Sequence, residues 1–285
     1  MRRQRWREPE YKISAGRCGD LKFNDAQFAE FRKQVIGRIV VASDPDYNSC
    51  RGTFMLAFQH FPQIIVYCVG FSDVVACIRF ARRVGLHVVC RSGGHSAAGY
   101  SVNDEMVLDV GDMNYVLIDP ATETALVGAG ANMAALNAAL DLYQLHVPGG
   151  GCGSVGLGGY MQGGGYGFTS LLFGMNCDSV IGVQVALADG RIVTANQHEN
   201  EDLFWAVRGG TGNNFGVLLE IKYRLRKLGP LWGPGSSGLL PLRRTPTPPA
   251  SRSLSGRLIL RARNARKAWG TSPFWFIPKT LATTI

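Results

Sequence analysis

The chain has 285 residues, 46% of them hydrophobic and 18% charged, a balance typical of a globular protein rather than a disordered one. Its net charge of +9 comes entirely from residues 229–285, which hold nine Lys and Arg and no acidic residue, whereas residues 1–228 hold 21 of each sign. Because the folded part is neutral, we expect no nucleic-acid partner. No apolar run reaches the roughly 18 residues of a membrane-spanning helix, so we expect no membrane partner either.

The seven cysteines are odd in number and include no C-x-x-C pair. This pattern argues against a disulfide framework or a zinc site, and it fits a reducing compartment. The N-terminus is basic, but no apolar segment follows it. We therefore expect no bound metal and a cytoplasmic location, or a secreted one if the N-terminus is incomplete.

The hydrophobic pattern predicts alternating strands and helices. Strands are expected, in chain order, at residues 64–67, 87–90, 106–110, 124–127, 180–187, 191–195 and 216–225. A helix capped by Asp73 should end at Gly85, an amphipathic helix should span residues 132–143, and Asn200 should cap a short helix. Asp189-Gly190 predicts a two-residue hairpin turn. Mixed elements of this kind favour an α+β fold with two lobes.

After Leu228 the character of the chain changes. Eight of the 13 prolines lie in residues 229–285, among clusters of Ser and Arg, and no strand alternation or helical period is recognisable there. Two interpretations stay open with equal weight. These residues form a flexible, solvated extension, or they are not the natural continuation of the chain, as a frameshift or a mispredicted gene end would produce.

Glycine is concentrated in one place, with eleven of the 36 glycines in residues 149–167. The string Gly151-Cys-Gly-Ser-Val-Gly156 matches the G-x-G-x-x-G pattern of nicotinamide-binding folds, which requires a helix to follow. Further glycines follow instead, and glycine costs about 1 kcal/mol per position in a helix. We therefore expect a poor helix there and reject a nicotinamide site.

Two glycine-rich loops each contain one nucleophilic side chain. In Arg91-Ser-Gly-Gly-His95-Ser96, backbone N–H groups can converge on an anion such as a pyrophosphate, with Arg91 and the serines as further donors. His95 at the loop apex is then either a covalent attachment point for a cofactor or a histidine hydrogen-bonded within a tight turn. Cys152, alone among glycines, is either a reactive thiol facing a planar ligand or a small buried filler.

Further motifs follow in the same order and spacing as in a known family. They are Gly163-Gly-Gly-Tyr-Gly167, Asp178-Ser-Val, Ala188-Asp-Gly-Arg, Asp202-Leu-Phe-Trp-Ala-Val-Arg-Gly-Gly and Asn214-Phe-Gly-Val217. With the two loops above, they resemble the FAD-binding domain of the vanillyl-alcohol oxidase / p-cresol methylhydroxylase (PCMH) flavoproteins, in particular the berberine-bridge-enzyme-like branch. The resemblance covers roughly residues 35–228. It leaves residues 1–34 as an N-terminal extension and the basic tail 229–285 where the family has its substrate domain.

This resemblance implies a PCMH-type domain of two α+β subdomains with FAD between them. It places the pyrophosphate on the Arg91–Ser96 loop, a bond from the flavin 8α-methyl to His95 and, in the bicovalent branch, a second bond from flavin C6 to Cys152. A side chain at Gly94 or Gly165 is expected to clash with the cofactor. The expected FAD-binding residues are Arg91, Ser92, Gly93, Gly94, His95, Ser96, Gly99, Cys152, Gly156, Gly159, Gly165, Tyr166, Gly167 and Val217.

The resemblance also implies the reaction. Members of the family oxidise an alcohol, a sugar or an amine by passing a hydride to FAD, which O₂ often reoxidises. A small-molecule substrate and O₂ are therefore the expected partners, and no catalytic base can be named from the sequence. The alternative is a non-catalytic, flavin-binding fragment of such an enzyme.

Overall fold

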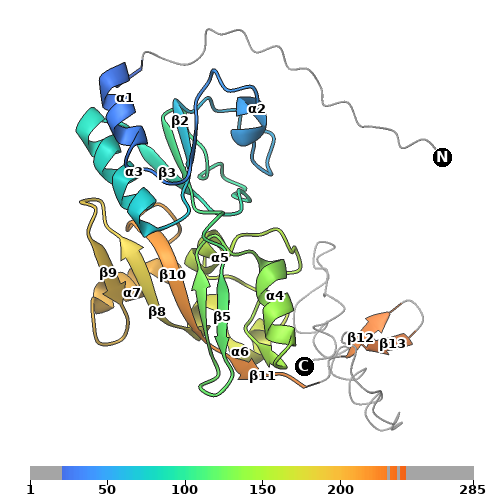
Figure 1. The fold of residues 1–285 in the computed structure, drawn as a ribbon. Helices are drawn as coiled ribbons and strands as arrows, with labels where there is room; N and C mark the ends of the chain where they lie inside the picture. The colour runs from blue at the N-terminus through green and yellow to red at the C-terminus, as the bar shows by residue number, and fades with distance from the viewer. Residues whose placement is uncertain (1–20, 230–231, 236–237, 242–285) are drawn as a thin grey trace, which may run out of the picture.

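The computed structural model describes residues 21–229, 232–235 and 238–241, and it contains two α+β subdomains that pack one on the other (Figure 1). The first, residues 21–109, is built on a four-stranded sheet of order β1-β2-β4-β3. Its strands are β1 (Arg38–Val40), β2 (Ile64–Tyr67), β3 (Val88–Arg91) and β4 (Met106–Asp109), and its helices are α1 (Asp25–Arg32), α2 (Tyr47–Cys50) and α3 (Phe71–Val84). The strands β2, β4 and β3 run parallel, and β1 pairs antiparallel at the edge.

The second subdomain is built on a five-stranded antiparallel sheet of order β5-β6-β10-β8-β9. Its strands are β5 (Val116–Asp119), β6 (Thr124–Gly128), β8 (Val180–Ala186), β9 (Ile192–Ala195) and β10 (Val217–Arg224). Its helices are α4 (Met133–Asp141), α5 (Leu157–Gln162), α6 (Ser170–Phe173), the 3₁₀ helix η1 (Asn176–Ser179) and α7 (Glu201–Val207). A two-stranded ladder joins β7 (Leu145–His146) to β11 (Arg226–Lys227). The α+β class and the two lobes that the sequence predicts are confirmed.

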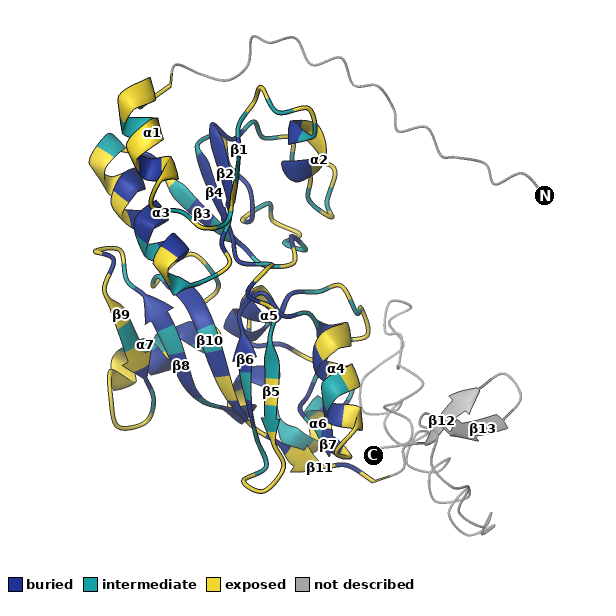
Figure 2. Ribbon diagram, in the orientation of Figure 1, coloured by how far each residue is buried: buried dark blue, intermediate teal, exposed yellow. Residues whose placement is uncertain are grey.

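One hydrophobic core runs through both subdomains. The buried residues of α3, such as Val74, Cys77 and Phe80, belong to the same cluster as Val183 of β8 and Ile221 of β10. Figure 2 shows this as buried ribbon on both sheets. The packing is extended at the surface by the side chain of Arg82, whose guanidinium donates to the carbonyl of Ala188 in the β8–β9 hairpin at 2.9 Å. The two lobes therefore share their apolar interior.

The helix α3 begins earlier than the sequence pattern suggests. Its N-cap is Gly70, not Asp73, and Gly85 ends it in a left-handed conformation, as predicted. The carboxylate of Asp73 is fully buried and accepts hydrogen bonds from the backbone N–H groups of Ile36, Gly37 and Val69. Asp73, in the first turn of α3, therefore connects the chain before β1 with the end of β2.

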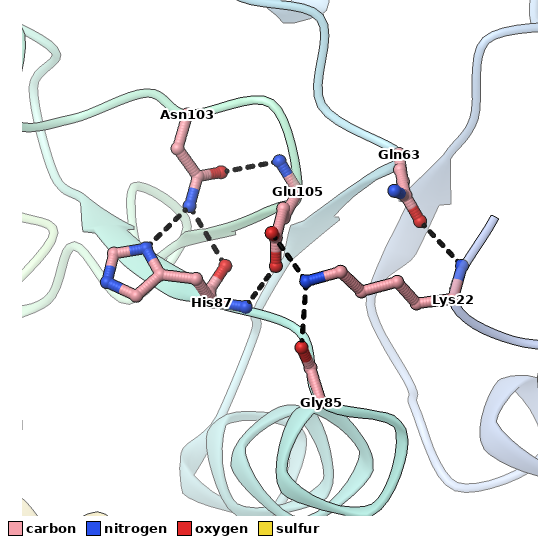
Figure 3. Close-up of polar contacts among 6 residues, drawn as sticks. All are labelled: Lys22, Gln63, Gly85, His87, Asn103 and Glu105. Atoms are coloured by element: carbon pink, nitrogen blue, oxygen red, sulfur yellow. Dashed lines mark hydrogen bonds and ion pairs between the residues drawn. The ribbon is translucent and has the colours of Figure 1, made fainter. Parts of the chain in front are cut away.

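The N-terminal segment before residue 35 also packs on the first subdomain. Phe31 of α1 is fully buried and stacks on Phe80 of α3 with 4.2 Å between ring centroids. Figure 3 shows how Lys22 is held near the start of the described chain: its ammonium donates to the carbonyl of Gly85 at 3.0 Å and to Glu105 at 2.6 Å. Residues 21–34 are thus part of the folded body.

Several local predictions are corrected by the structure. The segment after Gly156 does form a helix, α5, although it has only six residues and two of them are glycines. Gly156, directly before this helix, makes an isolated antiparallel bridge with Asn132, whereas a nicotinamide-binding unit has a strand of a parallel sheet at this place. In the β8–β9 hairpin, only Gly190 has a positive φ and its N–H bonds to the carbonyl of Leu187, so the turn is a type I turn followed by a left-handed glycine rather than a two-residue loop.

The basic tail contains one described element. Strands β12 (Trp232–Gly235) and β13 (Gly238–Pro241) pair as an antiparallel hairpin. The sequence shows no strand pattern after Leu228, so it does not predict this hairpin, and the other tail residues to which the two interpretations apply lie outside the described residues. Among the described helices, none combines the length and the apolar character needed to cross a membrane.

Candidate functional site

A cavity of about 390 Å³ lies where the two subdomains meet. The first subdomain contributes the end of β3 and the loop that follows it, and the second contributes α5 and the loop before β10. The described residues that line it are Cys90, Ser92, Gly93, Gly94, His95, Ser96, Tyr100, Ser101, Val110, Ala129, Val155, Gly156, Gly158, Gly159, Tyr160, Gln162, Gly163, Thr211, Gly212, Asn213, Gly216 and Leu218. No Asp, Glu, Lys or Arg is among these described lining residues, so the walls are glycine backbone, hydroxyls, amides and apolar side chains, together with the thiol of Cys90 and the imidazole of His95.

The two glycine motifs meet backbone to backbone at this cavity. A Cβ placed on Gly93 would overlap the backbone N of Gly156, and a Cβ on Gly156 would overlap the backbone N of Gly93 and the hydroxyl of Ser92. Ser92 is further fixed by donating to the carbonyl of Ala129 at 2.7 Å. These two glycines are therefore needed for the crossing of the loops, which builds the cavity wall.

His95 and Cys152 are joined through a single hydroxyl. The Nε2 atom of His95 lies 2.9 Å from Oγ of Ser154, and Sγ of Cys152 lies 3.5 Å from the same oxygen. The imidazole also stacks on Phe54, with 4.2 Å between ring centroids and 22° between planes. The hydrogen bond from Ser154 lowers the pKa of the exposed Cys152 thiol. Of the two sequence alternatives for Cys152, the structure thus excludes a buried filler.

The loop before β10 closes the cavity through Asn213. This residue has φ of +68°. Its side-chain carbonyl accepts from the N–H of Cys90 at 2.6 Å, and its amide donates to the carbonyl of Tyr100 at 2.8 Å. Asn213 therefore joins the end of β3 to the loop that carries Tyr100.

Two of the predicted cofactor residues face away from the cavity because strand side chains alternate. Cys90 and Ser92 line the cavity, so Arg91 between them points to the opposite side, where its buried guanidinium pairs with Asp109 of β4. Desolvation in this interior raises the pKa of Asp109, although Arg91 opposes the shift. In the same way, Gly216 and Leu218 line the cavity and Val217 does not.

Five further predicted residues also lie outside the described lining. A Cβ on Gly99 would meet the ring of Phe58 at 2.6 Å, and one on Gly165 would meet Cβ of Asn176 at 2.6 Å and the ring of Tyr160 at 2.7 Å. The expectation that a side chain at Gly165 would clash with the cofactor is therefore corrected, because it would first clash with the protein. The others are Tyr166 and Cys152, which are exposed, and Gly167, whose Cα packs against the backbone of Gly149.

The predicted residues that do line the cavity are Ser92, Gly93, Gly94, His95, Ser96, Gly156 and Gly159. Gly94 has φ of +66°, and a Cβ on it would make only ordinary contacts, the nearest at 3.8 Å. A Cβ on Gly159 would meet nothing within 4 Å. The exposed backbone of these glycines and the absence of carboxylates in the described lining suit a ligand that carries a pyrophosphate and a planar ring. The residues present therefore fit FAD.

Sequence reasoning did not single out three residues of the site: Ser101, Ser154 and Asn213. Ser154 lies inside the Gly151–Gly156 motif and Asn213 directly precedes the Asn214–Val217 motif, but nothing in a motif shows which distant residue a side chain will meet. Ser101 follows the His95 loop without any motif of its own.

Comparison with known proteins agrees with this site. Residues 62–196 match the family model described as FAD binding domain. The FAD-linked oxidoreductase pynB of Aspergillus niger is 38% identical over 189 residues, which make up 66% of this chain and 35% of that protein. The chain thus spans about a third of that relative's length.

Two solved structures show the same fold over the described part. Wild-type Physcomitrella patens BBE-like 1 superposes with a TM-score of 0.69 at 30% identity, covering 72% of this chain and 46% of that one. The carbohydrate oxidase from Microdochium nivale superposes with a TM-score of 0.68 at 31% identity, covering 73% of this chain and 44% of that one. Through these residues, the chain carries an FAD-binding domain with the PCMH-type fold, and it is similar to a berberine-bridge-enzyme-like protein and to FAD-linked oxidoreductases.

Proposed function

We propose that this chain is the flavin-binding part of an FAD-dependent oxidoreductase that oxidises an alcohol, a sugar or an amine and uses O₂ as electron acceptor. The observation that carries the proposal is the cavity between the subdomains, where two glycine loops cross and His95 stands at the rim beside Ser154 and Cys152. The similarity to the carbohydrate oxidase from Microdochium nivale supports an oxidase that acts on a small molecule.

FAD would be attached covalently through His95. The imidazole is held on two sides, by the ring of Phe54 and by the hydroxyl of Ser154 at Nε2, and Nδ1 makes no hydrogen bond to any described residue. A ring fixed in this way keeps the free nitrogen in one place, which lowers the entropic cost of forming a bond there. Nδ1 is therefore the nitrogen we assign to the linkage.

A second linkage would form through Cys152. Its thiol is exposed and has a lowered pKa because Ser154 donates a hydrogen bond to it, and thiolates rather than thiols are the nucleophiles in cysteine chemistry. The sequence Cys152-Gly-Ser154 therefore contains both the thiol that would form the second bond to FAD and the hydroxyl that lowers its pKa.

Bound FAD would supply the redox chemistry by accepting a hydride from the substrate and returning two electrons to O₂. The residues described here bind and orient the cofactor. Two lining residues, Cys90 and Tyr160, are poorly suited as the base that takes the substrate proton. Burial raises the pKa of Cys90 to about 12, and it raises the pKa of Tyr160, whose hydroxyl donates to the carbonyl of Tyr166, to about 12.

The covalent attachment is tested by acid precipitation of the purified full-length protein. We expect a yellow pellet and a flavin-bearing peptide that contains His95. The variant His95→Ala should release its flavin, while Cys152→Ala should keep one linkage and change the absorption spectrum. A colourless pellet with free FAD in the supernatant would contradict the linkage but leave FAD binding intact.

The oxidase activity is tested by mixing the flavin-loaded protein with a panel of alcohols, sugars and amines without O₂. Loss of the flavin colour with one class, followed by O₂ uptake and H₂O₂ release on mixing with air, is the expected result. A protein that binds FAD and is reduced by no member of the panel would instead be a flavin-binding module.

A further inference from the structure

One polar atom of the cavity wall has no partner in the protein. Ser101 is only 7% exposed and lines the cavity, and its Oγ makes no hydrogen bond. Among the side-chain oxygens and nitrogens buried in the described part of the chain, it is the one left without a hydrogen bond. Burying a hydroxyl without a partner is unfavourable, so such a group calls for an explanation.

Other polar side chains of the cavity wall make hydrogen bonds elsewhere, and none of these bonds goes to Ser101. The amide of Asn213 is occupied by the backbone of Cys90 and Tyr100. The hydroxyl of Thr211 accepts from Asn214 at 2.7 Å, and the hydroxyl of Ser96 accepts from the N–H of Tyr100 at 3.1 Å. The protein thus gives the Ser101 hydroxyl no partner of its own, which leaves this hydroxyl to a ligand in the cavity.

We propose that Ser101 is a binding residue for the AMP half of FAD, donating its hydroxyl hydrogen to an oxygen of the adenosine phosphate or ribose. The inference rests on FAD occupying this cavity. His95 and Gly156 lie at the loop crossing, where the proposed linkage places the flavin ring. Ser101 lies instead among Tyr100, Asn213 and the end of β3, so the part of FAD that reaches it is the part remote from the ring.

The test is a titration of the full-length chain in which both proposed linkages are removed by His95→Ala and Cys152→Ala, so that the cofactor exchanges. Ser101→Ala is added to this background, and the affinities for FAD, ADP and FMN are measured by fluorescence. We expect FAD and ADP to bind about tenfold more weakly, equivalent to roughly 1.4 kcal/mol, and FMN to bind unchanged. Ser179→Ala, which removes an equally buried hydroxyl outside the cavity, should leave all three affinities unchanged.

The melting temperature of the apoprotein separates binding from structure. Because Oγ of Ser101 bonds to nothing in the protein, Ser101→Ala should melt no lower than its parent. Unchanged affinity for FAD and ADP, an equal loss for FMN, or a lowered melting temperature would each overturn the assignment of Ser101 while the proposed function stands. Failure of the parent protein to bind FAD at all would overturn both.

Discussion

Two neighbouring glycines of α5 give a sharp test of where the cofactor lies. Gly159 lines the cavity, and a Cβ on it would meet nothing within 4 Å, whereas a Cβ on Gly158 would meet the carbonyl oxygen of Ala129 at 2.7 Å. Neither glycine has a positive φ. Gly159→Leu therefore adds a side chain to open space and removes the helix penalty of glycine, about 0.5–1 kcal/mol. Gly158→Ala forces a close contact with the backbone, at a cost of about 1–3 kcal/mol.

The two variants should therefore separate folding from cofactor binding. We expect Gly159→Leu to melt at or above the temperature of the unaltered apoprotein, and to lose most of its FAD because the leucine occupies the cofactor's space. Gly158→Ala should melt lower, by about 2–4 °C for each kcal/mol lost. The measurements are thermal unfolding and the ratio of flavin to protein absorbance after purification. Full FAD content in folded Gly159→Leu would show that FAD does not occupy this cavity.

Three further predictions concern charges and the exposed thiol. Arg91→Ala should destabilise the protein by about 3–5 kcal/mol in urea unfolding, because it leaves the buried carboxylate of Asp109 unpaired; a loss below 1 kcal/mol would contradict this. In FAD-free protein, Cys152 should be alkylated by iodoacetamide at lower pH than an ordinary thiol, and Ser154→Ala should move the reaction to higher pH, as followed by mass spectrometry. The backbone N–H of His87 and the ammonium of Lys22 lower the pKa of Glu105. The contribution of Glu105 to stability is therefore complete above its ordinary pKa of 4.5 and disappears as the pH falls through the lowered pKa. In urea unfolding at a series of pH values, Glu105→Gln should reduce the fall in the free energy of unfolding at acid pH.

The sequence was most informative where a pattern is local. The hydrophobic run Ile64–Tyr67 coincides with β2, and the helix predicted over residues 132–143 coincides with α4, because short apolar runs and helical periodicity involve neighbours in the chain. Asp73 shows the limit of such reasoning. Acidic residues favour helix starts, but this carboxylate is bonded to backbone N–H groups of the segment before β1, some 36 residues away. Only the tertiary fold could show that Asp73 lies three residues after the N-cap Gly70, with its carboxylate bonded to distant backbone rather than capping the helix.

The residues of the candidate site likewise depend on contacts between distant parts of the chain. A motif identifies a loop, but the phase of the adjoining strand decides which of its residues meet the ligand. Arg91 and Val217 are motif residues that alternate away from the cavity, while Asn213 and Ser101 face it without having been expected there. Predicting them would have required the relative placement of β3, α5 and the loop before β10, which depends on long-range packing rather than on local propensity.

The glycines of this chain show why a motif alone cannot be read as a list of ligand contacts. Gly93 and Gly156 lack a side chain because each touches the other's backbone, and Gly165 lacks one because Asn176 and Tyr160 fill its space. Gly159 alone among these leaves open space toward the cavity. The loop of Gly93 and the loop of Gly156 therefore form the cavity wall only where they cross. The hydrophobic core that aligns these two loops includes buried residues of α3 and of both sheets. Cofactor binding should accordingly depend on both subdomains being folded together. A substitution in the shared core that separates them should therefore abolish FAD binding even though every residue of the cavity wall is unchanged.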